Sequence, residues 1–237
     1  MEAIVLAGGL GKRLRSAVPD LPKPMAPIAG RPFLEHQLDY WEREGVTRAI
    51  LAVSYMADKI QAHFGNRYDG VELDYSVETE PLGTGGGLLL ALEKLRDKDE
   101  SFLVLNGDTF FEVKLDHLLT FHRAKQADLT LSLHSVDAND RYSGIDLAED
   151  GRVESIRKRE SGQGKMLVNG GAYLAKASLF TEALGEKGPR SLEDDLMPQW
   201  LKSRKNVYGF ISTGRFIDIG VPEDYAAAEG IIREVLS

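Results

Sequence analysis

Short runs of apolar, mostly β-branched residues alternate with amphipathic stretches along most of this 237-residue chain. Such alternation is typical of βαβ units, in which parallel strands form a sheet and helices cover its faces. The expected strands span residues 3–7, 49–54, 71–77, 102–106 and 129–136. The expected helices span residues 32–45, 56–64, 86–96 and 115–126. The pattern predicts an α/β fold with a Rossmann-like, doubly wound sheet.

The second half of the chain has a different rhythm. Asp150-Gly151 is a hairpin signal between apolar runs at residues 145–147 and 153–156, and residues 167–175 are expected to form a further strand. These strands predict a mixed sheet with a smaller α+β portion. A parallel sheet binds its ligands beyond the carboxyl ends of its strands, so the loops after those strands are where a functional site is expected.

Charge and cysteine content exclude several classes of function. The formal net charge is -8, which argues against long-range attraction to nucleic acid or to an anionic membrane surface. The chain has no cysteine, so disulfides and thiolate metal sites are excluded, and a metal ion must be held by oxygen or imidazole ligands. The first residues lack the basic region of a signal peptide, and a cytoplasmic location is expected.

The first strand runs into the segment GGLGKRLR at residues 8–15. Glycines let backbone N–H groups approach phosphate oxygens, and the clustered cations neutralise phosphate charge. A dinucleotide fold needs a third glycine where Leu14 stands, and a Walker loop needs Ser or Thr after its lysine, so both fit poorly. An ordinary strand-to-loop turn remains the alternative to triphosphate binding. The candidate phosphate-binding residues are Leu6, Ala7, Gly8, Gly9, Gly11, Lys12 and Arg13.

The segment Pro-Lys-Pro-Met at residues 22–25 favours the phosphate hypothesis, because two prolines restrict the positions that Lys23 samples. With the glycine-rich loop and its arginine, this segment resembles the first signature of the sugar-1-phosphate nucleotidyltransferases. The resemblance implies the nucleotide-diphospho-sugar transferase fold and a magnesium-dependent reaction between a nucleoside triphosphate and a sugar 1-phosphate. It also implies that Arg13 and Lys23 act at the reacting phosphate.

A second glycine-rich segment, EPLGTGG at residues 80–86, follows a strand and precedes a helix. In the resembled family this segment holds the nucleobase, and the helix N-terminus behind it favours phosphate. The candidates here are Glu80, Gly83 and Thr84. A carboxylate can accept both N1–H and N2–H of guanine, so Glu80 favours GTP over UTP and dTTP. The alternative is that Glu80 is a solvated charge and that backbone groups read the base.

Two aspartates are candidate magnesium ligands. Asp108 follows Gly107 at the end of the most apolar strand, and Asp218 lies in a distant apolar run before Gly220 and a helix that begins with proline. Mg²⁺ prefers one or two protein carboxylates together with substrate phosphates. The resemblance implies metal binding by both aspartates, catalysis by Asp108 and a nucleotide contact at Gly107. Helix or loop capping is the alternative.

The second half carries segments that resemble the family's sugar and sugar-phosphate contacts. The candidate substrate-binding residues are Tyr142, Gly144, Lys158, Arg159, Asn169, Gly170, Arg190 and Glu193. Many relatives have Glu-Lys-Pro where this chain has Arg157-Lys158-Arg159-Glu160, so which of Lys158 and Arg159 holds the sugar phosphate stays open. One domain over residues 1–237 is expected, with a nucleotide-binding half at 1–133 and a sugar-phosphate-binding half at 134–237.

Over the whole chain the motifs look most like those of bacterial guanylyltransferases for D-glycero-α-D-manno-heptose 1-phosphate, which serve capsule or surface polysaccharide synthesis. A short mannose-1-phosphate guanylyltransferase, or a UTP-using relative, is the near alternative. A dinucleotide-dependent oxidoreductase and a non-catalytic nucleotide-sensing module are the alternatives from other classes. GTP and a sugar 1-phosphate are the expected partners, with self-association into a homo-oligomer possible and with no nucleic acid or membrane.

Overall fold

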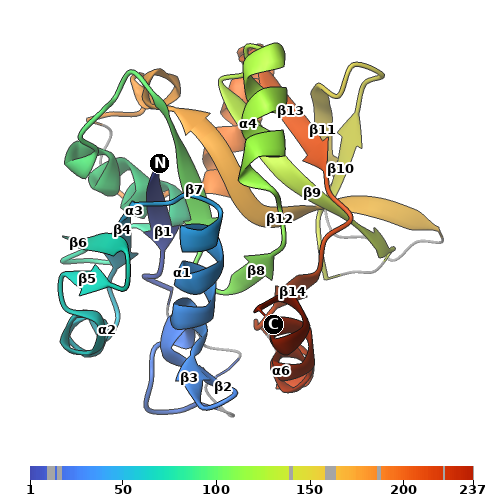
Figure 1. Cartoon of the computed structure of the whole chain (residues 1–237). Coiled ribbons are helices and arrows are strands. Elements are labelled where there is room, and N and C mark those ends of the chain that lie inside the picture. The colour runs from blue at the N-terminus through green and yellow to red at the C-terminus, as the bar shows by residue number, and fades with distance from the viewer. Residues whose placement is uncertain are drawn as a thin grey trace.

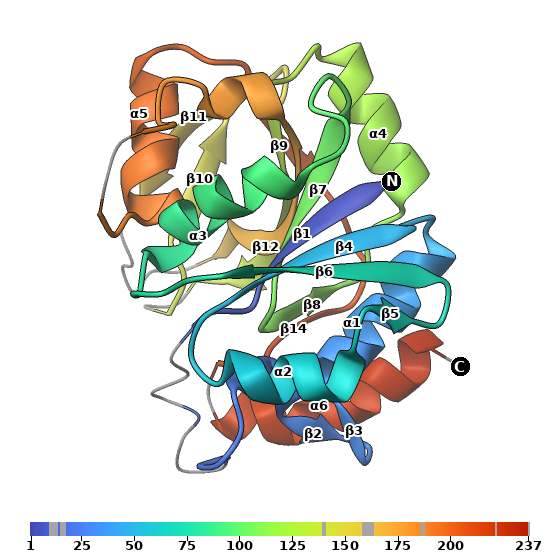
Figure 2. The same ribbon diagram turned by 90° about the vertical axis from the view of Figure 1, so that its left-hand side faces the viewer.

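The sheet is built around four parallel strands. The computed structural model describes residues 1–9, 14, 18–138, 141–157, 164–185, 188–220 and 222–236. The parallel strands lie in the order β6 (Val71–Val77), β4 (Arg48–Val53), β1 (Glu2–Leu6) and β7 (Ser101–Asn106). Every residue of β4 is buried, because helices cover both faces of this central strand. The carboxyl ends of the four strands therefore meet at one edge of the sheet (Figure 2).

Antiparallel pairing extends the sheet on the β7 side. The long strand β12 pairs antiparallel with β7, β9 and β10, while β13 pairs parallel with β9. The added strands are β9 (Leu129–Asp137), β10 (Gly144–Leu147), β11 (Val153–Arg157), β12 (Lys165–Lys176) and β13 (Val207–Ile211). The short β5 (Arg67–Tyr68) closes the other side against β6. Figure 1 shows the added strands beside the parallel portion, as expected for a mixed sheet with a smaller α+β portion.

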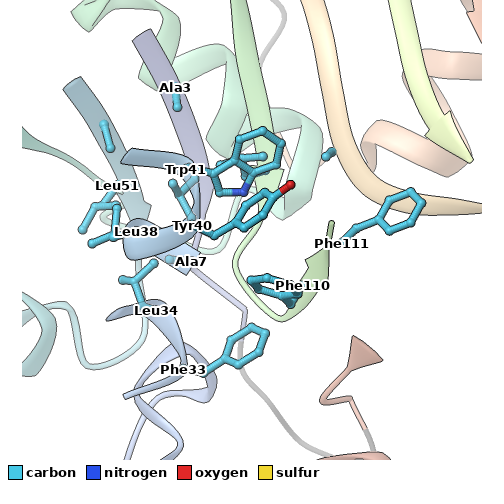
Figure 3. Packing of buried hydrophobic residues seen from close by; sticks show 14 of the residues in the cluster. Ala3, Ala7, Phe33, Leu34, Leu38, Tyr40, Trp41, Leu51, Phe110 and Phe111 are labelled. Carbon is cyan, nitrogen blue, oxygen red and sulfur yellow. The ribbon is translucent and has the colours of Figure 1, made fainter. Parts of the chain in front are cut away.

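Helices cover the two faces of the sheet. They are α1 (Phe33–Arg43), α2 (Ala57–Phe64), α3 (Gly83–Ala91), α4 (Leu115–Ala124), α5 (Met197–Lys202) and α6 (Pro222–Leu236). In Figure 2, α1, α2 and α6 lie below the parallel strands, and α3 and α5 lie above them. Two clusters of buried apolar side chains correspond to these two faces. In the lower cluster Tyr40 packs edge-on against Trp41 and Phe110, with ring centroids 5.3 and 5.2 Å apart (Figure 3).

Several short elements complete the fold. They are the 3-10 helices Lys23–Met25, Leu92–Lys94 and Ala177–Phe180, the π-helix Leu192–Leu196, and the strand pairs β2 (Pro27–Ile28) with β3 (Arg31–Pro32) and β8 (Thr109–Phe111) with β14 (Phe216–Asp218). The π-helix is notable because such helices are rare and concentrate at functional sites.

The structure confirms the five expected strands of the first half to within one residue at each end. One expected helix differs, because α3 begins at Gly83 rather than Gly86 and is followed by a 3-10 turn. The earlier start has a physical cause: the carbonyl of Arg190 accepts the N–H groups of Gly85 and Gly86 and so caps the first turn. In the described part of the chain, no helix combines the length and the apolar character needed to span a bilayer.

Candidate functional site

A cavity of about 490 Å³ opens where the parallel strands end, and we call it the Gly8 cavity. Its lining residues are Leu6, Gly8, Gly9, Ala52, Glu78, Pro81, Gly83, Thr84, Gly87, Asn106 and Asp108. They come from the carboxyl ends of β1, β4 and β7, from the loops that follow β1, β6 and β7, and from α3. The cavity therefore lies where parallel sheets bind ligands.

The start of the glycine-rich loop forms one wall of this cavity. Leu6, Gly8 and Gly9 line it, and the buried Ala7 donates its N–H to the carbonyl of Ala52 at 2.8 Å. Gly107 packs behind this wall, and its N–H donates to the carbonyl of Leu6 at 3.0 Å. A Cβ at Gly107 would lie 2.7 Å from that carbonyl oxygen, so the close approach needs glycine. The candidates Gly11, Lys12 and Arg13 lie outside the described residues.

The glutamate that lines the cavity is Glu78, whereas Glu80 is exposed and does not line it. One carboxylate oxygen of Glu78 accepts the N–H of Leu82 at 2.8 Å. The other oxygen lies so near Gly8 and Gly87 that a Cβ on either glycine would crowd it. Burial raises the pKa of Glu78, although the bond from Leu82 opposes the shift. The structure thus presents Glu78, two residues before the predicted position, to a ligand in this cavity.

The segment that begins α3 is held by the second half of the chain. The carbonyl of Arg190 accepts from Gly85 and Gly86 at 2.9 and 3.3 Å, and the N–H of Arg190 donates to the carbonyl of Leu82 at 2.7 Å. The sequence predicts that the N–H groups at the start of α3 face phosphate. Those of Gly85 and Gly86 instead donate to the carbonyl of Arg190. Gly83 has a φ of +73°, and a Cβ there would lie 2.4 Å from the oxygen of Arg190, so this junction requires glycine.

A second cavity, of about 390 Å³, adjoins the first and is here called the Asn169 cavity. Its lining residues are Thr84, Asn106, Asp108, Thr109, Leu131, Arg141, Tyr142, Ser143, Ile145, Ile156, Asn169, Glu193, Asp194, Met197, Phe216 and Asp218. Three of them, Thr84, Asn106 and Asp108, also line the Gly8 cavity. The two cavities consequently share a wall, as a reaction between two bound molecules requires.

Of the predicted substrate-binding residues, Tyr142, Asn169 and Glu193 line the Asn169 cavity. Gly144 begins β10 and pairs with Val168, outside the cavity wall. Gly170 packs against the ring of Phe111, which would lie 2.2 Å from a Cβ at that position. Arg190 makes the backbone contacts described above and does not line either cavity. Lys158 and Arg159 lie outside the described residues.

A hydrogen-bond network joins the polar residues of the second cavity to the first. Asn169 donates to the hydroxyl of Tyr173 at 2.5 Å, and that hydroxyl donates to Glu193 at 3.3 Å. Thr84 donates to the other oxygen of Glu193 at 2.9 Å and accepts the N–H of Leu192 at 2.8 Å. Tyr173 is fully buried, and burial together with Glu193 raises its pKa well above the usual value. The hydroxyl thus stays protonated and orients both neighbours.

The two predicted aspartates and the predicted lysine converge beside the shared wall: Asp108 lines both cavities, Asp218 lines the Asn169 cavity, and Lys23 contacts both carboxylates. Nζ of Lys23 lies 2.5 Å from Oδ2 of Asp108 and 3.8 Å from Oδ1 of Asp218. The Lys23 side chain is only 9% exposed, so its charge is little screened by water. Residues separated by nearly two hundred positions therefore bring two carboxylates onto one cation.

The strand pair β8–β14 fixes the positions of the aspartates. Asp218 ends β14 and lies opposite Thr109, which directly follows Asp108. The N–H of Ile219 donates to the carbonyl of Asp108 at 3.0 Å, and the N–H of Gly220 donates to the carboxylate of Asp218 at 2.7 Å. These backbone bonds hold both side chains on the same short ribbon.

Arg141 adds a cation on the far side of Asp218. Its guanidinium lies 3.1 Å from Oδ2 of Asp218 and also pairs with Asp224 on α6. Successive ion pairs therefore link side chains of alternating charge, in the order Asp108, Lys23, Asp218, Arg141 and Asp224. Among the described residues no group of three or more histidine or acidic side chains is arranged to hold a metal ion.

Sequence reasoning missed Glu78 and Arg141. Glu78 is the first residue beyond β6, so the strand-end argument that identified Asp108 could have found it as well. Arg141 directly precedes the predicted substrate-binding residue Tyr142, but nothing in the sequence indicates its pairing with Asp218 and Asp224. Such pairing depends on which distant segments the fold brings together.

A larger cavity, of about 720 Å³, lies away from this site, against the hairpin β10–β11. Its charged residues include Asp146 and Arg157, which pair with each other at 3.0 Å. It shares Ile145 with the Asn169 cavity but includes none of the predicted site residues. The converging charges, rather than the size of the cavity, therefore identify the functional site.

The fold and the site define a nucleotidyltransferase, and the chain belongs to the Nucleotidyl transferase family, which matches residues 2–234. It is 44% identical over 230 residues to a protein of Aneurinibacillus thermoaerophilus named D-glycero-alpha-D-manno-heptose 1-phosphate guanylyltransferase, with 97% of each chain covered. A mannose-1-phosphate guanylyltransferase of Mycobacterium tuberculosis is 33% identical over 227 residues, covering 95% of this chain and 62% of the relative.

Solved structures agree with this family. The crystal structure of HddC from Yersinia pseudotuberculosis complexed with GMP-PN superposes with a TM-score of 0.83 at 35% identity, and the match covers 97% of this chain and 98% of that one. The similarity confirms the nucleotide-diphospho-sugar transferase fold and an enzymatic function of the transferase class.

Proposed function

We propose that this chain transfers GMP from GTP to D-glycero-α-D-manno-heptose 1-phosphate and releases pyrophosphate. The observation that carries the proposal is the position of Lys23, whose ammonium contacts Asp108, a residue that lines both cavities, and faces Asp218 of the Asn169 cavity. One cavity then holds the nucleotide and the other the sugar phosphate. The name and the near-complete coverage of the Aneurinibacillus relative support heptose as the sugar.

Glu78 supports guanine as the base. Its half-buried carboxylate lines the Gly8 cavity, and one of its oxygens is not used by the bond from Leu82, whereas Glu80 is exposed. Guanine offers two adjacent donors, N1–H and N2–H, and a carboxylate is the side chain that accepts both. The GMP-PN ligand named for the HddC structure agrees with a guanine nucleotide. GTP preference is therefore proposed to rest on Glu78 in place of Glu80.

Asp108 and Asp218 fit a magnesium site. Both carboxylates face the same ammonium, so both can face the same divalent cation, and Mg²⁺ needs only one or two protein carboxylates beside substrate phosphates. When bound, Mg²⁺ adds positive charge next to the phosphates. Mg²⁺ dependence, like the roles of these two residues, is a proposal that rests on this geometry.

The proposed reaction is attack of a sugar-phosphate oxygen on the α-phosphorus of GTP, with pyrophosphate leaving in line. The attacking oxygen is already ionised at neutral pH, so no general base is needed, and the protein's task is charge neutralisation and positioning. Lys23 is placed to neutralise charge at the junction of the cavities. Arg13 is proposed for the same task on sequence grounds alone.

In the Asn169 cavity, Asn169 and Glu193 are proposed to form hydrogen bonds with sugar hydroxyls, with Tyr142 beside them. Their network with Tyr173 and Thr84 fixes the direction of each donor and acceptor. We further propose one domain in which residues 1–133 mainly bind the nucleotide and residues 134–237 mainly bind the sugar phosphate. A cytoplasmic location, a role in capsule or surface polysaccharide synthesis and a homo-oligomer remain proposals from the sequence.

Mannose 1-phosphate is the second candidate substrate, supported by the similarity to mannose-1-phosphate guanylyltransferases. The deciding experiment measures pyrophosphate release for GTP, UTP, dTTP and ATP against heptose 1-phosphate and mannose 1-phosphate, each with and without Mg²⁺. We expect the highest kcat/KM with GTP, heptose 1-phosphate and Mg²⁺. Higher efficiency with mannose 1-phosphate would change the sugar, and no pyrophosphate with any pair would overturn the enzymatic function.

A further inference from the structure

The sugar 1-phosphate brings an anion to a site that already contains carboxylates, so a cation must meet it in the Asn169 cavity. The sequence-based candidates Lys158 and Arg159 lie outside the described residues. Among the described residues that line the Asn169 cavity, Arg141 is the one cation. We propose that Arg141 binds the phosphate group of the sugar 1-phosphate, an inference that rests on the function proposed above.

The position of Arg141 fits the geometry of the reaction. Its Nη2 lies 3.1 Å from the Asp218 carboxylate and 3.2 Å from the Asp218 carbonyl oxygen. Asp218 in turn faces Lys23 at the wall shared with the Gly8 cavity. A phosphate bound by Arg141 would therefore lie at the end of the Asn169 cavity nearest the nucleotide. There its oxygen can attack the α-phosphorus of GTP.

The guanidinium is also held in place before the ligand arrives. Asp224 of α6 pairs with it from one side, and the ring of Tyr142 lies 4.8 Å from its central carbon. The side chain is 25% exposed, so it is largely ordered by protein contacts yet open to the cavity. Guanidinium presents a planar fork of donors that matches phosphate oxygens, which an ammonium does not. A preoriented fork loses little side-chain entropy when phosphate binds.

The competing explanation is that Arg141 only ties α6 to β14 through Asp224 and Asp218. The two roles differ in what they predict for the nucleotide. A structural tie supports Asp218 and would therefore weaken binding of Mg²⁺ and GTP when it is removed. A phosphate ligand affects the affinity for the sugar phosphate and leaves GTP binding intact.

The test uses calorimetry on the full chain saturated with Mg²⁺ and a non-hydrolysable GTP analogue. Arg141→Gln should weaken binding of the sugar 1-phosphate by roughly tenfold to a hundredfold, the loss expected for hydrogen bonds to a charged group. Arg141→Lys should recover part of that loss. Affinity for the GTP analogue and for the phosphate-free sugar should stay within about twofold of wild type, because neither contact involves Arg141.

Two control variants separate the explanations. Arg215→Gln removes a surface arginine that pairs with Glu234 and should leave every affinity unchanged. Asp224→Asn removes the tie to α6 but keeps the guanidinium, and it should change sugar-phosphate affinity by less than about threefold. Equal losses for Asp224→Asn and Arg141→Gln, or weaker GTP binding in Arg141→Gln, would overturn the inference.

The outcome also separates this inference from the proposed function. Wild-type enzyme that releases pyrophosphate from GTP, together with an Arg141→Gln variant of normal sugar-phosphate affinity, would reject the role of Arg141 alone. Wild-type enzyme that releases none with any sugar 1-phosphate would reject the proposed function itself. Melting temperatures of all variants show whether each is folded, and Arg141→Lys provides the comparison if Arg141→Gln does not fold.

Discussion

Replacing Glu78 by glutamine changes one charged acceptor in the Gly8 cavity into an amide of the same shape. In wild type one oxygen of Glu78 accepts the N–H of Leu82 at 2.8 Å, so the other oxygen is left to meet the base. In Glu78→Gln the amide oxygen takes over the bond from Leu82, because only that atom of the amide accepts. The NH₂ group then faces the N–H donors of guanine, donor against donor.

The size of the effect follows from this arrangement. A hydrogen bond to a charged group contributes about 1.5–3 kcal/mol. A loss of about 1.5–3 kcal/mol lowers kcat/KM for GTP roughly tenfold to 150-fold. Uracil presents a carbonyl acceptor that the new NH₂ group can reach, so kcat/KM for UTP should stay the same or rise. The GTP-to-UTP ratio should therefore fall by at least about tenfold.

The assay is pyrophosphate release with a fixed sugar 1-phosphate, run for wild type, Glu78→Gln and the matched control Glu80→Gln. Glu80 is exposed, and its substitution should change neither nucleotide by more than about twofold. Loss of GTP preference in Glu80→Gln but not in Glu78→Gln would refute the structural reasoning and restore the prediction from sequence. Because burial raises the pKa of Glu78, GTP binding by wild type should also weaken as the pH falls through that raised pKa, whereas Glu78→Gln should show no such step.

Two further predictions follow from the described contacts. Asp218→Asn removes one of the two carboxylates that face Lys23. It should lower kcat by about a hundredfold or more and raise the Mg²⁺ concentration needed for half-maximal rate. An unchanged rate and Mg²⁺ requirement would reject Asp218 as a metal ligand. His122 is buried and its pKa is lowered from 6.5 to about 4, chiefly by burial, so the unfolded chain takes up this proton first as the pH falls. Folding stability should therefore drop between about pH 6.5 and 4, at about 1.4 kcal/mol per pH unit at most, and His122→Gln should flatten this part of the unfolding curve measured by urea titration at each pH.

The parallel part of the fold could be predicted because its signal is local. Residues 49–54 form an unbroken apolar run, and the corresponding strand β4 is buried at every position. The hairpin around Gly151 was equally clear, since a turn signal separates two apolar runs. By contrast β8 and β14 are only three residues long and are stable only because they pair with each other. No local pattern distinguishes such short strands from loops.

In the candidate site, too, some features could be predicted from the sequence and others required the structure. Lys23, Asp108 and Asp218 were identified by motif, and their convergence on one point is what the structure adds. Glu80 was chosen over Glu78 because the sequence does not show which side chain the strand end directs into a cavity. Testing the expectation of phosphate at the start of α3 also needed long-range information, since the carbonyl of Arg190, far along the chain, accepts two of those N–H groups.

The charge balance around Lys23 supports the proposal of a divalent cation at this site. Asp108, Asp218 and Asp224 supply three carboxylates, and Lys23 and Arg141 supply two cations, so the cluster alone carries a net charge of about -1. A nucleoside triphosphate and a sugar phosphate add several more negative charges in a partly buried space, where charges are poorly screened. Two protein cations cannot offset that repulsion while they also pair with carboxylates. An ion between Asp108 and Asp218 would satisfy both acids and release Lys23 toward the nucleotide, so the same contacts that order the protein alone become available to its substrates.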